Sequence, residues 1–233
     1  MDENREPGDG SGEEAAVIDD IHPPHQAAHS WRDIFIHLAT ITVGLFIALS
    51  LEGCVEWQHH RHLVHEAREN IRTEIVDNQK QLHDALDQIH KEQAQVKADI
   101  ESLKALRKDV NAHGLSVTLS FNNSALQDAS WNTARETGAL SFMAYPEVKK
   151  YAEVYHLQGL FGDQTARVTS AYTHSFSVLY IFDVDAKESP EVKKTDIASG
   201  LQKVLAVQSE LMLYNSIASG LDKEYSETLR QSF

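Results

Sequence analysis

The stretch from Ile34 to Leu51 reads IFIHLATITVGLFIALSL and contains no aspartate, glutamate, lysine or arginine. As a helix that rises about 1.5 Å per residue, it extends roughly 27 Å, which is sufficient to cross the hydrocarbon core of a bilayer. Trp31 precedes this apolar run and Trp57 follows it, and tryptophan favours the interface between membrane and water. We therefore predict a transmembrane helix over 31–57 with Trp31 and Trp57 as membrane anchors; a buried core helix is the alternative interpretation.

The end of the apolar run offers a second alternative. Leu51-Glu52-Gly53-Cys54 resembles a bacterial lipobox, and Cys54 is the single cysteine of the chain. A lipoprotein would be cleaved before this cysteine and acylated on it. Glu52, however, stands where a small or aliphatic residue is usual, and the helical pattern continues after Cys54 without a flexible spacer. The uncleaved helix is therefore the favoured interpretation, and a lipoprotein acylated at Cys54 is an alternative.

The basic residues beside the run suggest an orientation. Arg32 lies on its N-terminal side, whereas Arg61, Arg68 and Arg72 follow on its C-terminal side. Because basic flanks tend to remain in the cytoplasm, we expect a single-pass protein of the bacterial inner membrane with a cytoplasmic C-terminal domain.

The net charge is concentrated at the N-terminus. The 233 residues include 35 acidic and 21 basic side chains, for a formal net charge of -14. Residues 1–30 hold eight of the acidic side chains against Arg5 alone, together with several glycines and prolines, so we predict a disordered acidic tail over 1–30. The acidic balance provides no basic face for nucleic acid.

A heptad pattern follows the apolar run. No proline or glycine occurs between Trp57 and Gly114. Aliphatic residues recur at intervals of seven at Ile75, Leu82, Ile89, Val96, Leu103 and Val110. The companion positions of this heptad seam are mixed: Ile71, Asn78, Ala85, Glu92, Asp99 and Leu106. The pattern predicts a helix that continues from the transmembrane segment to about Ala112, with coiled-coil packing. One good seam with polar interruptions fits an antiparallel bundle within the chain or a homo-oligomer, and Asn78 is a candidate for fixing its register.

The remaining residues predict three further helices. Residues 115–121 alternate between apolar and polar side chains, and without a second strand to pair with we expect an extended connector lying on helices. Ser124 is a candidate N-cap for a short helix that ends near Gly138. Pro146 and Pro190 each open a longer helix. The apolar stripe expected on the first of these comprises Val148, Tyr151, Tyr155, Leu160, Val168, Tyr172, Phe176 and Leu179. The fold class is therefore all-α, with an elongated bundle domain over 58–233.

Several short segments resemble a known family. Trp31-Arg32 leads into GLFIALSLE, and the segments AREN and IRTEI follow. Ser130-Trp131 and Thr137-Gly138-Ala139-Leu140 come later, before Pro146 and Tyr155. This pattern resembles a family of uncharacterised bacterial membrane proteins that have one N-terminal transmembrane helix and a helical domain. The resemblance implies location and architecture; it implies no activity, and no catalytic residue is carried over from it.

Two patterns raise the question of a metal site. Four histidines lie just after the apolar run: His59, His60, His62 and His65. On a helix, His59 and His62 share a face and Glu66 follows His62 by four residues, a spacing that can place two ligands on one metal ion. Imidazoles among lipid headgroups, with pH-sensitive membrane contact, are the simpler interpretation. Glu-x-x-His also occurs twice, as Glu56–His59 and Glu153–His156. Paired Glu-x-x-His helices are typical of ferritin-like di-iron sites, so a metal-dependent membrane enzyme is an alternative function.

Phosphate-binding glycine loops, nucleophile elbows and kinase or zincin motifs do not occur in the sequence. We therefore expect no enzymatic activity and no cofactor. The favoured hypothesis is a membrane-anchored helical bundle that serves as an accessory, scaffold or sensor module. Its expected partners are the lipid bilayer and a second copy of the chain through the heptad seam.

Overall fold

The computed structural model describes residues 31–122, 124–179, 181 and 190–231. The predicted acidic tail over 1–30 lies outside the described residues. The chain divides into two compact units, Met1–Cys54 and Val55–Phe233, and each is described by itself.

The described part of the N-terminal unit is the first section of α1, a helix that extends over Trp31–Lys108. Every residue from 31 to 54 is exposed. The hydroxyl groups of Thr40, Thr42 and Ser50 donate to the backbone carbonyl oxygens four residues earlier, at 2.7 to 2.8 Å. These polar groups are thus satisfied within the helix itself. Among the described residues this is the one helix that is long and apolar enough to cross a membrane, and none of its apolar window is buried.

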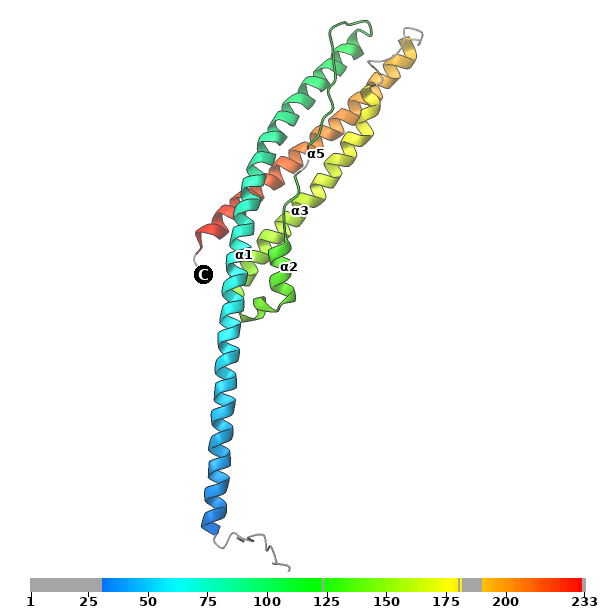
Figure 1. The fold of residues 1–233 in the computed structure, drawn as a ribbon. Coiled ribbons are helices and arrows are strands. Elements are labelled where there is room, and N and C mark those ends of the chain that lie inside the picture. The colour runs from blue at the N-terminus through cyan, green and yellow to red at the C-terminus, as the bar shows by residue number, and fades with distance from the viewer. Residues whose placement is uncertain (1–30, 123, 180, 182–189, 232–233) are drawn as a thin grey trace, which may run out of the picture. The chain divides into compact units, whose positions relative to one another are not determined.

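The C-terminal unit is built from helices, and no described residue belongs to a strand. After α1 come α2 over Ala129–Glu136, the short helix η1 over Ala139–Phe142, α3 over Tyr145–Ser175, η2 over Phe176–Leu179 and α5 over Pro190–Arg230 (Figure 1). The predicted all-α class is confirmed, and so are the helix starts at Pro146, in the first turn of α3, and at Pro190.

Side-chain hydrogen bonds give the directions of the three long helices. Arg68 of α1 pairs with Glu147 of α3, and ten residues further on Asn78 pairs with Gln158, so α1 and α3 are parallel. Helix α5 is antiparallel to both, as shown by the pairs Gln79–Asp222, Gln93–Leu211 and Gln164–Glu210. Parallel neighbours need a crossover, and residues 109–122 and 124–128 return along the bundle to supply it (Figure 1).

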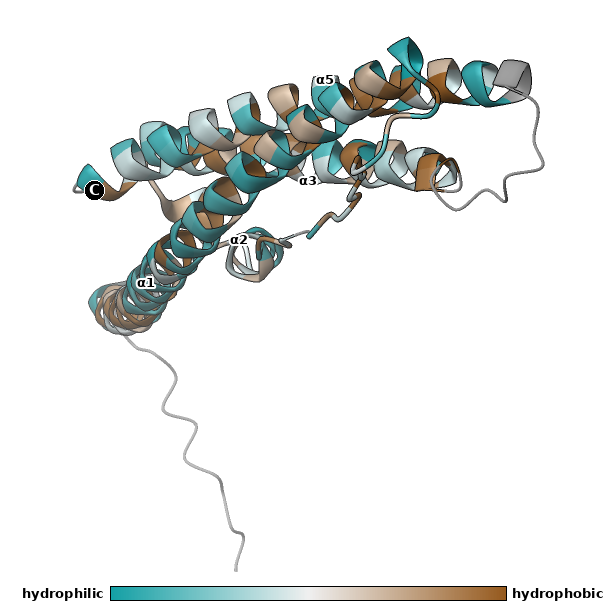
Figure 2. Cartoon of the chain, turned by 90° about the horizontal axis from the view of Figure 1, so that it is seen from above, coloured by the Kyte–Doolittle hydropathy of each residue, from teal (hydrophilic) through white to brown (hydrophobic). Residues whose placement is uncertain are grey.

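The heptad seam lies in the core. Ile75, Leu82, Ile89, Val96 and Leu103 are all buried, and so are all six companion positions, polar ones included. Helices α3 and α5 share this spacing: burial recurs every seven residues at Val154, Phe161 and Val168, and at Ile197, Val204, Leu211, Ala218 and Tyr225. Figure 2 shows apolar and polar residues alternating along these helices. The seam is therefore occupied within one chain, and a second copy would have to displace that packing to use it. The predicted antiparallel arrangement is correct for α5 but not for α3, which is parallel to α1.

The predicted end of α1 is wrong by four residues. The helix ends at Lys108 rather than near Ala112. The Asp109 carboxylate accepts a hydrogen bond from the Asn111 backbone N–H at 3.0 Å, an Asx turn that competes with the helical hydrogen bond. Gly114, at φ 74°, then occupies a conformation that glycine adopts easily. Val110, the sixth residue of the predicted seam, therefore lies beyond the helix.

The short helix begins later than predicted, whereas the extended connector is confirmed. Residues 115–122 and 124–127 form neither helix nor strand. Helix α2 begins at Ala129 with Asp128 at its N-cap position, so Ser124 is not the cap. Asn78 explains why α2 starts later than predicted. Its side chain accepts from the Gln127 backbone N–H at 2.8 Å and donates to the Gln127 carbonyl oxygen at 2.6 Å. These bonds hold Gln127 in the extended segment.

The predicted stripe of α3 is correct in part. Tyr151, Tyr155, Val168 and Tyr172 are buried. Val148 is half-buried, and Leu160, Phe176 and Leu179 are exposed. Burial follows the seven-residue spacing through Phe161, and a spacing of seven residues turns the helix by almost two complete turns. Leu160 therefore falls outside the buried face, and Phe161 replaces it.

Candidate functional site

A hollow of about 460 Å³ opens beside α1 within the C-terminal unit. It is lined by Trp57, His60, Arg61, Val64, His65, Arg68 and Phe142, and we call it the Trp57–Phe142 hollow. Six of the seven residues come from α1, whereas Phe142 ends η1. Gly138, at φ 77°, makes the turn from α2 into η1. The Phe142 ring stacks on His60 with centroids 3.7 Å apart and planes 17° from parallel.

The two arginines of this hollow have different partners. Arg68 donates to both carboxylate oxygens of Glu147, at 2.6 and 2.7 Å, and Glu147 is 1% exposed. The Arg61 guanidinium instead lies over the Trp57 ring, 4.8 Å from its centroid, and no carboxylate of the described residues forms an ion pair with it. The charge of Arg68 is thus neutralised inside the hollow, whereas Arg61 is exposed over an aromatic ring and has no carboxylate partner among the described residues.

The two predicted anchors are both exposed. Trp31 contacts Phe35 edge-on, with ring centroids 5.3 Å apart, and Trp57 lies under Arg61. Cys54 is also exposed and lies inside the uninterrupted α1. Cleavage before Cys54 would cut a continuous helix, and acylation at this residue stays a prediction.

The predicted histidine cluster does not gather into a metal site. His60 lies 3.9 Å from Glu56, and His65 lies 3.5 Å from Glu69, each one turn apart on α1. His60 is half-buried, whereas His65 is exposed. His59, His62 and Glu66 are exposed on α1. In the described part of the chain no three histidine, cysteine, aspartate or glutamate side chains come close enough to hold a metal ion.

The two Glu-x-x-His motifs lie at different levels of the bundle. Glu153 pairs with Lys149 at 3.7 Å, and His156 is exposed. Because Arg68 is level with Glu147 and α1 runs parallel to α3, Glu153 lies beyond the level of Arg68. His59 lies nine residues before Arg68 on α1, which corresponds to about 14 Å along the helix. The structure therefore does not bring Glu56 and His59 together with Glu153 and His156, and the ferritin-like site is not formed by these four residues.

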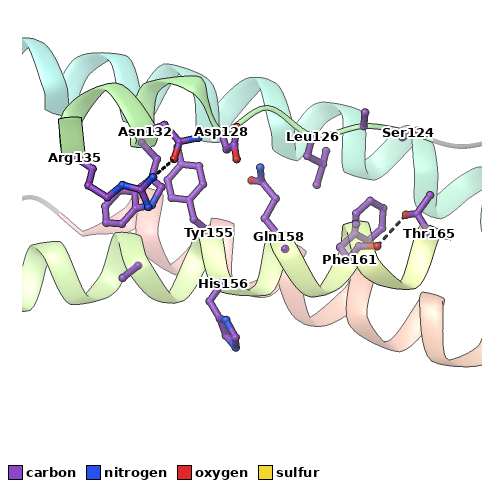
Figure 3. A pocket seen from close by; sticks show the side chains of 15 residues that line it. Ser124, Leu126, Asp128, Asn132, Arg135, Tyr155, His156, Gln158, Phe161 and Thr165 are labelled. Atoms are coloured by element: carbon purple, nitrogen blue, oxygen red, sulfur yellow. Dashed lines mark hydrogen bonds between the residues drawn. The ribbon is translucent and has the colours of Figure 1, made fainter. Parts of the chain in front are cut away.

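A second hollow, of about 560 Å³, lies between the connector, α2 and α3 (Figure 3). Several of its polar side chains have partners within the chain: Arg135 donates to Asn132 at 3.1 Å, Gln158 donates to the Gln127 carbonyl oxygen at 2.7 Å, and the Tyr155 hydroxyl donates to Glu74 of α1 at 2.6 Å. His156 points away from the other labelled side chains in Figure 3. Of these side chains, Gln158 holds the connector on the bundle.

The polar residues of α1 that interrupt the apolar pattern have a common task. Their side-chain oxygens accept backbone N–H groups of the connector and of α2 at 2.8 to 3.0 Å: Glu74 from Ser130, Asn78 from Gln127, Glu92 from Asn122 and Asp99 from Thr118. Three of the four, Asn78, Glu92 and Asp99, occupy companion positions of the heptad seam. The heptad pattern reveals Asn78, Glu92 and Asp99 as interruptions but not their partners, because a backbone N–H 19 to 49 residues away leaves no mark in the periodicity. Glu74, whose partner is 56 residues away, lies outside the seam positions.

Two of these carboxyl groups are only partly satisfied. Glu92 and Asp99 are buried, and one oxygen of each has no hydrogen-bond partner in the structure. Burial raises the pKa of both groups. Hydrogen bonds oppose this shift: Glu92 accepts from Asn122 and Gln88, and Asp99 accepts from Thr118 and Gln95. These bonds offset only part of the cost of placing a carboxylate in the core.

No family model, no curated protein and no solved structure matches this chain. The resemblance to bacterial single-pass membrane proteins therefore stays a prediction, and any function has to be argued from the chain itself.

Proposed function

We propose that this protein is a single-pass membrane protein whose helical bundle acts as an accessory, scaffold or sensor module beside the bilayer. The observation that carries the proposal is the apolar run: it is helical, has apolar residues on every side and is covered by no described part of the chain. Such a surface is unfavourable in water, because each exposed aliphatic side chain loses about 1.5 to 3 kcal/mol relative to burial. A bilayer provides the missing cover.

The continuity of α1 supports a scaffold or sensor role. The same helix contains the apolar run and the buried seam of the bundle, and the sequence from Trp57 to Lys108 contains no proline or glycine. A helical segment without such residues resists bending, and Gly53 lies in α1 just before this segment. We propose that the bundle is held by this helix and presents its surface to a protein partner, in the bacterial inner membrane and on the cytoplasmic side.

Membrane fractionation tests the anchor. The full chain is expressed in bacteria, and the membranes are washed with alkaline carbonate and with urea. We expect the chain to remain in the pellet, and we expect V43D/I47D to move to the soluble fraction, since each aspartate costs about 2.5 to 3.5 kcal/mol at the centre of a spanning helix. The matched control M212D/L213D places the same charges at exposed apolar positions of α5 and is expected to stay in the pellet. If the wild-type chain is extracted by carbonate, the proposal is wrong.

Three measurements refine the proposal. Fusion of the C-terminus to a reporter that is active on only one side of the membrane tests the cytoplasmic orientation. The intact mass of the membrane-bound chain distinguishes the full N-terminus from a diacylated product that starts at Cys54. Crosslinking and size measurement in mild detergent test for a homo-oligomer, and a monomer under all conditions contradicts it.

A further inference from the structure

We infer that the Trp57–Phe142 hollow binds the phosphate of an anionic phospholipid headgroup, with Arg61 as its principal ligand. This inference rests on the proposed membrane anchor, since it requires the hollow to lie beside a bilayer. The proposed anchor depends on the apolar run alone, so it gives the Trp57–Phe142 hollow no role.

The charge of Arg61 favours an anionic ligand. Its guanidinium lies over Trp57, and no described carboxylate forms an ion pair with it, in contrast to Arg68, which Glu147 neutralises. A guanidinium offers several N–H groups in one plane and binds a phosphate through two of them at once. The imidazoles of His60 and His65 line the same hollow and carry further N–H donors.

Exposed aromatic side chains lie at and near the hollow. Phe142, the last residue of η1, is 49% exposed, and Tyr145, the first residue of α3, is 78% exposed. Together with the exposed Trp57 they place three aromatic side chains near one end of the bundle, from segments about 85 residues apart in the sequence. Aromatic side chains of this kind favour the headgroup region of a membrane.

The size and the polarity of the Trp57–Phe142 hollow also suit a phosphate headgroup. A hollow of about 460 Å³ lies within the usual range of small-molecule sites, about 300 to 1,000 Å³, and accommodates a glycerophosphate headgroup. Of the acidic side chains nearby, Glu147 is paired with Arg68. Glu56 and Glu69 lie 3.9 and 3.5 Å from the imidazoles of His60 and His65. Among the residues that line the hollow, none is acidic.

Lipid retention by the full chain tests the inference. The protein is purified in mild neutral detergent, titrated with phosphatidylglycerol or with phosphatidylcholine, and examined by native mass spectrometry. We expect preferential retention of phosphatidylglycerol, and we expect R61Q to bind it about tenfold more weakly, since one charge-assisted pair is lost. R107Q, which removes an exposed arginine from the last turn of α1, is the matched control and is expected to bind as the wild type does. Circular dichroism of both variants checks that the bundle remains folded.

The outcomes separate the hypotheses. Equal retention of the two lipids, or equal loss in R61Q and R107Q, overturns the headgroup site and leaves the anchor intact. Competition by soluble glycerol phosphate or inorganic phosphate at the concentration of the lipid overturns the lipid as the source of the phosphate. Loss of the anchor is recognised independently, by extraction of the wild-type chain with carbonate.

Discussion

The two sections of α1 show how one helix meets two environments. In the apolar run from Ile34 to Leu51, aliphatic side chains point in every direction, and Leu45 is 58% exposed. In the heptad seam, apolar side chains occupy one stripe, and Leu82 is 0% exposed. The backbone is the same in both sections. The distribution of side chains around the helix therefore decides whether a helix needs a surrounding apolar medium or packs against its own chain.

The polar side chains of the apolar run and of the heptad seam also differ in their hydrogen-bond partners. In the run, hydroxyl groups such as that of Thr40 bond to the carbonyl oxygen of the preceding turn. In the seam, Asn78, Glu92 and Asp99 bond to a distant segment. Polar side chains of the run are thus independent of the fold, whereas those of the seam are part of it.

The largest effect is expected when the same substitution is made in both sections. L82A removes a fully buried side chain and leaves a cavity, so we expect the free energy of unfolding to fall by about 2 to 5 kcal/mol. L45A changes an exposed position of the run and is expected to leave the unfolding of the bundle unchanged within about 0.5 kcal/mol. Urea unfolding in mild detergent, followed by circular dichroism, measures both. Similar losses in the two variants would show that the run belongs to the folded core.

The two arginines of the Trp57–Phe142 hollow extend this comparison. R68A leaves Glu147 buried without its partner, and we expect a loss of about 2 to 3 kcal/mol, below the range for a fully buried pair because Arg68 is itself partly exposed. R61A removes no buried partner and is expected to leave stability unchanged. The double variant R68L/E147L is expected to recover most of the loss. Equal stability of R68A and R61A in thermal unfolding contradicts the pairing.

A smaller effect is expected at Asp99. D99A removes the acceptor of the Thr118 N–H and is expected to cost about 1 to 3 kcal/mol. D99N retains an acceptor oxygen and removes a buried charge, so its stability should equal or exceed that of the wild type at neutral pH. Denaturant unfolding of the two variants side by side provides the measurement. If both lose stability equally, the hydrogen bond to the connector is not what Asp99 contributes.

The smallest effect is a dependence on pH. Because burial raises the pKa of Glu92 and Asp99 above their ordinary values of 4.5 and 3.8, the folded state binds protons more tightly than the unfolded state. This contribution to stability is complete below the ordinary values and is lost as the pH rises through the raised ones. The stability of E92Q/D99N relative to the wild type should therefore increase with pH from about 4 upward. A constant difference between the two melting temperatures across this range would argue against burial as the cause.

Local patterns predicted much of the fold. The apolar run, the seam and the prolines at 146 and 190 placed the long helices, because hydrophobic periodicity and helix starts are properties of neighbouring residues. The error at Ser124 arises from the connector, because Asn78 of α1 holds Gln127 in the extended segment. The error at Ala112 has a local origin, the Asx turn of Asp109. Phe142 was missed as a site residue because its neighbour His60 lies 82 residues away in the sequence.

The sequence by itself determined the helical class, the boundaries of the apolar run and the position of the heptad seam, since each depends on side chains within a few turns. Only the tertiary structure decided that the polar companions of the seam hold the connector, that Arg68 pairs with Glu147 while Arg61 does not pair with a carboxylate, and that the Glu-x-x-His motifs lie apart. These features depend on hydrogen bonds and packing between segments far apart in the chain. Their register is decided by the helices packing against one another, and no local pattern encodes it.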